Sequence, residues 1–218
     1  MKINGVLFRD FDRRWVGIEN KKNCKKIAKK LKRKELISPI FGYFFIDKDN
    51  GISLKIVGNF EKDNKNKIYI NEDYLEDELV IDYEFMQKIN LDVELIDEEI
   101  IKHIEGANII SNKIDSEYRN INNFLETRNF KYLDKFRDER YPDDVETILE
   151  NKEQEIDEYL YVTIEGIMDK RPDLLIARLN DSSEYNKDYI EGDYVAVKYY
   201  EDEDKLKIYG HLKRREED

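Results

Sequence analysis

Short apolar runs separated by turn-forming residues fill the C-terminal part of the chain, between residues 159 and 212. The runs are rich in β-branched and aromatic side chains and are bounded by Gly, Asp, Asn and Pro, a pattern typical of an antiparallel meander. They cover 159–164, 174–179, 194–200 and 206–212. Residues 131–218 are therefore predicted to form an antiparallel, barrel-like β module.

A helical periodicity marks residues 21–34. Cys24, Ile27, Ala28 and Leu31 fall at i, i+3, i+4 and i+7, which places a narrow apolar stripe on an otherwise basic segment. Asn20 precedes the first turn and is placed to cap it. We therefore expect an amphipathic, strongly basic helix here.

The rest of the N-terminal part alternates strand-like runs with turns. Asp-Asn-Gly at 49–51 supplies residues that tolerate positive φ, so a hairpin is expected there. Residues 113–129 lack Pro and Gly and space their apolar side chains as a helix does. The expected strands are 3–8, 14–18, 40–46, 52–57, 67–70 and 91–96, and a further helix is expected at 97–105.

Together these elements predict an α+β protein, with a mixed N-terminal sheet carrying helices and a separate C-terminal β module. The expected domains are residues 1–112 and residues 131–218, joined by a connecting helix at 113–130. A chain of 218 residues is long enough to bury a core without disulfides or metal.

The net charge of the chain indicates which class of partner to expect. The formal net charge is −12, the isoelectric point is about 4.9, and 40% of the residues are charged. Such a chain repels nucleic acid and anionic membranes over most of its surface, so we expect a basic protein as partner and neither nucleic acid nor a membrane. The helix at 21–34 is the exception, because it carries nine Lys or Arg and no acid. It could lie on phosphates, or it could be a solvated surface helix.

The segment 72–99 has the opposite charge, with acids interleaved with apolar residues. A dense carboxylate face can imitate a nucleic-acid backbone and dock on a basic protein, or it can be an ordinary solvated face. The tyrosines of the β module could anchor an interface or could be normal strand residues. The candidate binding residues are Glu72, Asp73, Glu76, Asp77, Glu78, Tyr194, Tyr199 and Tyr200.

Few residues suit catalysis or cofactor binding. Cys24 is the single cysteine and the two histidines are His103 and His211, so an intramolecular disulfide and the usual zinc ligand sets are excluded. Glycine-rich phosphate loops are absent from the sequence. We predict no catalytic residue, no metal and no cofactor. The sequence shows neither a secretion signal nor an apolar run of membrane-spanning length, which predicts a soluble cytoplasmic protein.

One alternative is a metal-dependent nucleic-acid processing enzyme. Pro142-Asp143 followed by Glu150-Asn-Lys152 matches the order of residues that hold Mg²⁺ in one large nuclease fold. Asp143, Asp144 and Glu150 would then surround the metal, with the lysine near the attacking water. The competing interpretation is a turn that starts a helix or strand.

Several short motifs carry a family resemblance: Phe136-Arg-x-x-x-Tyr-Pro-Asp-Asp-Val, Tyr161-Val-Thr-Ile-Glu-Gly, Ala177-Arg-Leu-Asn and Glu191-Gly-Asp-Tyr-Val. The C-terminal half resembles a family of uncharacterised bacterial β-rich domains, some of them in loci of the toxin–immunity type. The resemblance implies a fold and no activity. We therefore expect a non-catalytic, acidic protein-binding factor of the immunity or inhibitor type. A structural subunit of a larger assembly is the remaining alternative, and the oligomeric state is open.

Overall fold

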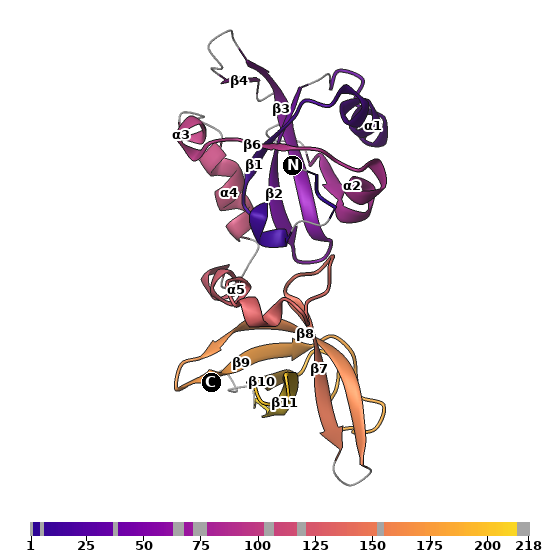
Figure 1. Ribbon diagram of the computed structural model, residues 1–218, viewed down its shortest axis with the longest axis vertical. Coiled ribbons are helices and arrows are strands. Elements are labelled where there is room, and N and C mark those ends of the chain that lie inside the picture. The colour runs from indigo at the N-terminus through magenta and orange to yellow at the C-terminus, as the bar shows by residue number, and fades with distance from the viewer. Residues whose placement is uncertain are drawn as a thin grey trace. The chain divides into compact units, whose positions relative to one another are not determined.

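A computed structural model of the protein describes residues 2–4, 7–36, 39–62, 68–71, 78–102, 107–116, 121–151 and 155–212. The chain divides into two compact units, residues 1–119 (unit 1) and residues 120–218 (unit 2). Unit 1 combines helices with a sheet, and unit 2 is built mainly of strands (Figure 1). The predicted α+β class is confirmed.

The sheet of unit 1 is antiparallel throughout its described strands, in the order β4-β3-β2-β1-β6, with β5 paired to β3. The predicted hairpin joins β2 to β3. Its turn is fixed by Asp47, whose Oδ1 accepts the backbone N–H groups of Asp49 and Asn50, and by Gly51 at a φ of 70°. The strands are β1 (Trp15–Ile18), β2 (Ile40–Asp47), β3 (Gly51–Lys62), β4 (Ile68–Asn71), β5 (Val80–Asp82) and β6 (Glu94–Leu95).

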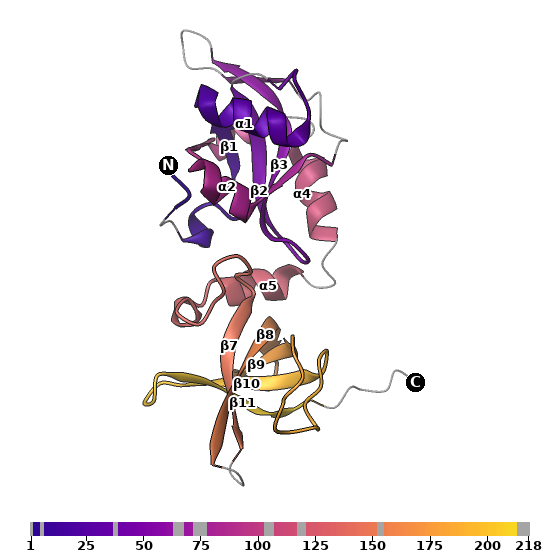
Figure 2. The ribbon, with the colours of Figure 1, turned by 90° about the vertical axis from the view of Figure 1, so that its right-hand side faces the viewer.

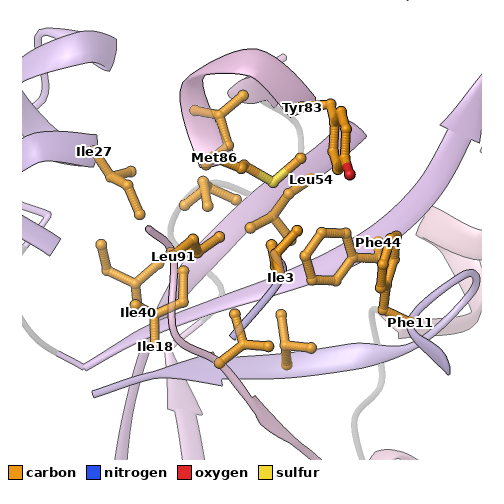
Figure 3. Packing of buried hydrophobic residues seen from close by; sticks show 14 of the residues in the cluster. Ile3, Phe11, Ile18, Ile27, Ile40, Phe44, Leu54, Tyr83, Met86 and Leu91 are labelled. Atoms are coloured by element: carbon orange, nitrogen blue, oxygen red, sulfur yellow. The ribbon is translucent and has the colours of Figure 1, made fainter. Parts of the chain in front are cut away.

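Helices cover both faces of this sheet. One core holds Ile27 of α1 and Met86 of α2 against strand residues such as Leu54, and these side chains converge in Figure 3. The other core packs Ile110 of α4 against Phe41 and its neighbours. Because both faces are covered, seven consecutive residues of β2 are buried, which gives one apolar run without alternation. The helices are α1 (Lys21–Leu31), α2 (Tyr83–Ile89), α3 (Glu98–Ile101) and α4 (Ala107–Ser116).

Local signals explain where α1 begins and ends. The side chain of Asn20 accepts the N–H groups of Lys22 and Asn23, which confirms the predicted cap. The helix stops at Leu31, earlier than predicted, because Lys32 adopts a left-handed conformation with φ of 56°.

The strand predicted at 3–8 is wrong for its described residues, 3–4 and 7–8, none of which is in a strand. A short 3₁₀ turn, η1 (Phe8–Asp10), occupies its end, and at its start Lys2 makes an isolated bridge to Asp92. Phe8 and Phe11 are three residues apart and both are buried in the first core. A helical turn presents residues at that spacing to one side, whereas a strand would point them to opposite sides.

The single connecting helix expected at 113–130 is instead two helices in the described residues. Helix α4 belongs to unit 1, where Ile114 is buried and Asp115 pairs with Arg13. Helix α5 (Ile121–Arg128) belongs to unit 2, and the 3₁₀ turn η2 (Lys131–Leu133) follows it. The described helices include none that is long and apolar enough to cross a membrane.

Unit 2 is a closed five-stranded barrel in the order β10-β11-β7-β8-β9. Four of its pairings are antiparallel, whereas the pairing of β7 with β11 is parallel. In a meander of five strands the first and last run the same way, so an entirely antiparallel barrel could not close. The strands are β7 (Asp144–Asn151), β8 (Ile156–Met168), β9 (Arg171–Leu179), β10 (Tyr194–Tyr200) and β11 (Lys205–His211).

Candidate binding face of the barrel

The acidic candidates lie in unit 1. Glu78 is exposed just before β5. Glu72, Asp73, Glu76 and Asp77 lie outside the described residues, so the geometry of that cluster stays a prediction.

The three candidate tyrosines all lie on β10 but do not share a surface. Tyr194 and Tyr200 point to the outside of the barrel and are separated by about 20 Å along the strand. The Tyr194 hydroxyl donates to Glu165 at 3.0 Å, and Lys207 lies 5.0 Å from the centre of the Tyr200 ring. Tyr199 faces the other way, where it packs on the barrel core and stacks on Tyr132 with ring centres 5.0 Å apart.

The carboxylates of the alternative metal site each have their own partner. Asp143 is buried and accepts two hydrogen bonds from the Arg128 guanidinium, at 2.8 and 2.6 Å. Asp144 Oδ1 accepts from the Thr163 hydroxyl at 2.6 Å. Glu150 accepts from Lys207 Nζ at 2.5 Å. Across the described residues, no three His, Cys, Asp or Glu side chains are grouped to hold a metal ion.

A different set of side chains gathers on the outside of the β7–β8 hairpin, which projects from the rest of the barrel (Figures 1 and 2). Residues directly opposite each other in an antiparallel pair point to the same face. Their register places Glu146 opposite Tyr161 and Ile148 opposite Tyr159. Further along the same face, Asp144 lies opposite Thr163 and Glu150 opposite Asp157.

We call this surface the acidic tyrosine face and define it by Asp138, Asp144, Glu146, Asp157, Tyr159 and Tyr161. Its tyrosine rings are accessible, because Tyr159 is 61% exposed and Tyr161 is 40% exposed. From Asp144 to Glu150 the face extends over about 20 Å. Partial burial, followed by the negative charges of Glu146, Asp138 and Asp144, raises the pKa of Tyr161 above its usual value. The phenol therefore stays neutral while carboxylates surround it.

The chemistry of this face favours a cation. A guanidinium or ammonium group above the Tyr161 ring would be attracted by the π face and by the nearby carboxylates. Like charges also lie side by side, since Glu150 and Asp157 are directly opposite each other. That arrangement costs stability, and the bond from Lys207 to Glu150 offsets part of it.

The face belongs to the acidic half of the molecule. Residues 120–218 contain 27 Asp or Glu and 16 Lys or Arg, which gives a net charge of −11. Residues 1–119 contain 23 Asp or Glu and 22 Lys or Arg, which gives a net charge of −1. Nearly all of the excess negative charge therefore lies in unit 2. Long-range attraction of a basic protein is accordingly directed to the barrel.

Sequence reasoning missed this face because it missed β7. The signal was present as a partial alternation, in which Val145, Thr147 and Leu149 are buried and Glu146 and Glu150 are exposed, although Ile148 between them is also buried. The acids and Pro142 obscured the pattern, since both are typical of turns.

The barrel also carries a groove of about 760 Å³ at the seam between β7 and β11. Lys207 lies at this seam and donates to Glu150 at 2.5 Å and to Glu203 at 2.6 Å. The pair with Glu150 links β11 to β7, two strands that share a single paired position, Ile148 with Lys207, whereas Glu203 lies in the turn before β11. The groove is thus a structural seam next to the acidic tyrosine face.

Comparisons of the chain with protein-family models, with curated proteins and with solved structures give no match.

Proposed function

We propose that the protein is a non-catalytic binding factor, of the inhibitor or immunity type, whose barrel unit docks on a basic protein through the acidic tyrosine face. The observation that carries the proposal is the placement of two accessible tyrosine rings among carboxylates on one hairpin face, in a unit of net charge −11. Tyrosine supplies rigid contact area, and the carboxylates supply steering and specificity for Lys and Arg.

The mode of recognition follows from the geometry. A basic partner is drawn to the barrel by its net charge and is oriented by the face, where a cation over Tyr161 meets Asp138 and Glu146. The carboxylates of the acidic tyrosine face act mainly on the rate of association, whereas Tyr159 and Tyr161 act on the rate of dissociation. The complex should therefore weaken as salt rises.

The test compares three forms of the full chain as bait for proteins of its own host at low salt. The first is the natural sequence, the second is Glu146→Lys with Tyr161→Ala, and the third is the control Glu201→Lys with Tyr185→Ala. Both variants change the charge by the same amount and remove one exposed tyrosine, but Glu201 and Tyr185 lie outside the acidic tyrosine face.

We expect a stoichiometric basic protein to be retained by the natural chain and by the control, to be lost with the face variant, and to dissociate at high salt. The proposal fails when the face variant retains the same protein as the natural chain. It also fails when both variants lose that protein equally, because charge alone would then explain the capture.

A further inference from the structure

Unit 1 carries a second site of opposite character, a groove of about 730 Å³ that runs along α1. Its apolar floor is formed by the partly exposed Ala28 together with Cys24 and Leu36, which are each only 2% exposed. Five lysines line its rim, and all are exposed: Lys21, Lys25, Lys29, Lys32 and Lys34. Most of these residues repeat at three- and four-residue spacing, so they form one face of the helix, and α1 is seen lying over the sheet in Figure 2.

The rim lysines differ from a lysine on another edge of the same helix. Lys30 pairs with Asp82 at 3.5 Å and lies 5.3 Å from the centre of the Phe85 ring. None of the five rim lysines has an acidic partner within the part of the chain that the structure describes. All five line the groove and are exposed to solvent.

This arrangement costs stability in the isolated protein. Lys21, Lys25 and Lys29 are spaced by four residues, and like-charged pairs at this spacing destabilise a helix. Lys21 also lies at the positive end of the helix dipole, where a cation is unfavourable. A negatively charged ligand in the groove would relieve both effects.

The spacing indicates which kind of anion fits. At about 1.5 Å of rise per residue, neighbouring rim lysines are about 6 Å apart and the row from Lys21 to Lys32 extends over about 16 Å. A partner helix with an acid at every fourth position repeats its carboxylates at the same interval. A fatty acid offers one carboxylate to five lysines, and a nucleic acid offers no aliphatic side chain to the floor of Cys24, Ala28 and Leu36.

We propose that this groove binds an acidic amphipathic helix of a partner protein, with apolar side chains on the floor and carboxylates against the rim lysines. Such helix-in-groove binding uses anchors at helical spacing. The site is independent of the acidic tyrosine face, since it lies in the other unit and selects the opposite charge. The protein would then have two binding surfaces of opposite charge on one chain.

The probe is a fluorescein-labelled peptide in which Glu-Ala-Ala-Leu is repeated four times, so that Glu and Leu form adjacent stripes on a helix. Its binding to the full chain is measured by fluorescence anisotropy. Two control peptides replace every Glu with Gln or every Leu with Ser. The test variant is Lys25→Glu with Lys29→Glu, and its control is Lys22→Glu with Lys26→Glu, which makes the same charge change on the same helix away from the groove.

We expect the peptide to bind the natural chain and the Lys22/Lys26 control alike, and to bind the Lys25/Lys29 variant at least roughly tenfold more weakly, as two reversed ion pairs imply. Both control peptides should bind worse than the probe. Circular dichroism and the Trp15 fluorescence of each variant should match those of the natural chain, which would show that the fold is intact.

Four results overturn the proposal. Equal loss in the two lysine variants would mean attraction by net charge alone. Binding of the Ser peptide as tight as that of the probe would show that the apolar floor takes no part. Tighter binding of a labelled oligothymidine than of the peptide, or self-association removed by the Lys25/Lys29 variant, would assign the groove to nucleic acid or to a second copy of this chain.

Discussion

The pair formed by Arg128 and Asp143 offers the sharpest structural prediction. Both side chains are buried in unit 2, and Asp143 accepts from Nε and Nη2 of the same guanidinium. Asp143→Asn preserves the shape of the side chain but removes the negative charge that pairs with the buried guanidinium of Arg128. It tests whether Asp143 is structural, as this geometry indicates, or part of a metal site.

The expected cost is large. Breaking a buried ion pair by removing one partner destabilises proteins by about 3–5 kcal/mol. For a unit of this size that loss lowers the melting temperature by roughly 12 °C or more. It is also a substantial share of the 5–15 kcal/mol that typically separates the folded and unfolded states of a domain.

The assay exploits the position of the single tryptophan. Trp15 lies in unit 1, where it is nearly buried and stacks on Phe41 with ring centres 4.9 Å apart. Tryptophan fluorescence during urea unfolding therefore reports unit 1, and far-ultraviolet circular dichroism reports both units. Asp143→Asn should move part of the dichroism transition to lower urea and leave the fluorescence transition in place.

Two controls make the result decisive. Asp181→Asn applies the same chemical change to an exposed residue of unit 2 and should alter stability by about 0.5 kcal/mol at most. Arg128→Met with Asp143→Leu removes both charges and should recover most of the loss, because apolar replacements of a whole buried pair are tolerated. The reasoning is refuted when Asp143→Asn costs under about 1 kcal/mol or when the double variant is no better.

Two further predictions concern packing and pH. A Cβ on Gly42 would lie 2.7 Å from the backbone oxygen of Lys55. Gly42→Ala should therefore destabilise unit 1 by about 1–3 kcal/mol, measured by Trp15 fluorescence during urea unfolding. The control Gly210→Ala should change stability little, because the space around Gly210 is open. Burial raises the pKa of Asp144 above 3.8, so stability from its neutral form is lost as pH rises through the folded-state value. Asp144→Asn should therefore gain stability relative to the natural chain as the pH rises above about 4, measured by urea unfolding, and a pH-independent difference would contradict this.

Much of the fold could be predicted because the signals were local. The hairpin at 47–51 and the cap at Asn20 each depend on neighbouring backbone groups. The four predicted strands of the barrel follow from runs of β-branched and aromatic residues bounded by turn residues. The features that could not be predicted depend on contacts between residues far apart in the sequence. They are the pairing of β7 with β11, which closes the barrel, and the burial of Phe8 and Phe11, which favours a turn over a strand.

The candidate site was harder to predict for the same reason. Tyrosines close in sequence on β10 are divided between the two sides of the strand, and Tyr199 is engaged by Tyr132 from before β7. Conversely, Glu146 and Tyr161 are fifteen positions apart in the chain and become neighbours through strand pairing. Composition identified an acidic, tyrosine-rich protein, but only the register identifies the face on which both occur.

Carboxyl footprinting of the complex tests the central claim most directly. The protein is treated with a carbodiimide and glycine ethyl ester, alone and with the captured basic partner, and modification at each carboxylate is read by mass spectrometry. We predict that the partner protects Asp138, Glu146 and Asp157 and leaves the exposed Glu201 fully reactive. Protection of Glu201 with none at Glu146 would place the partner elsewhere and contradict the account.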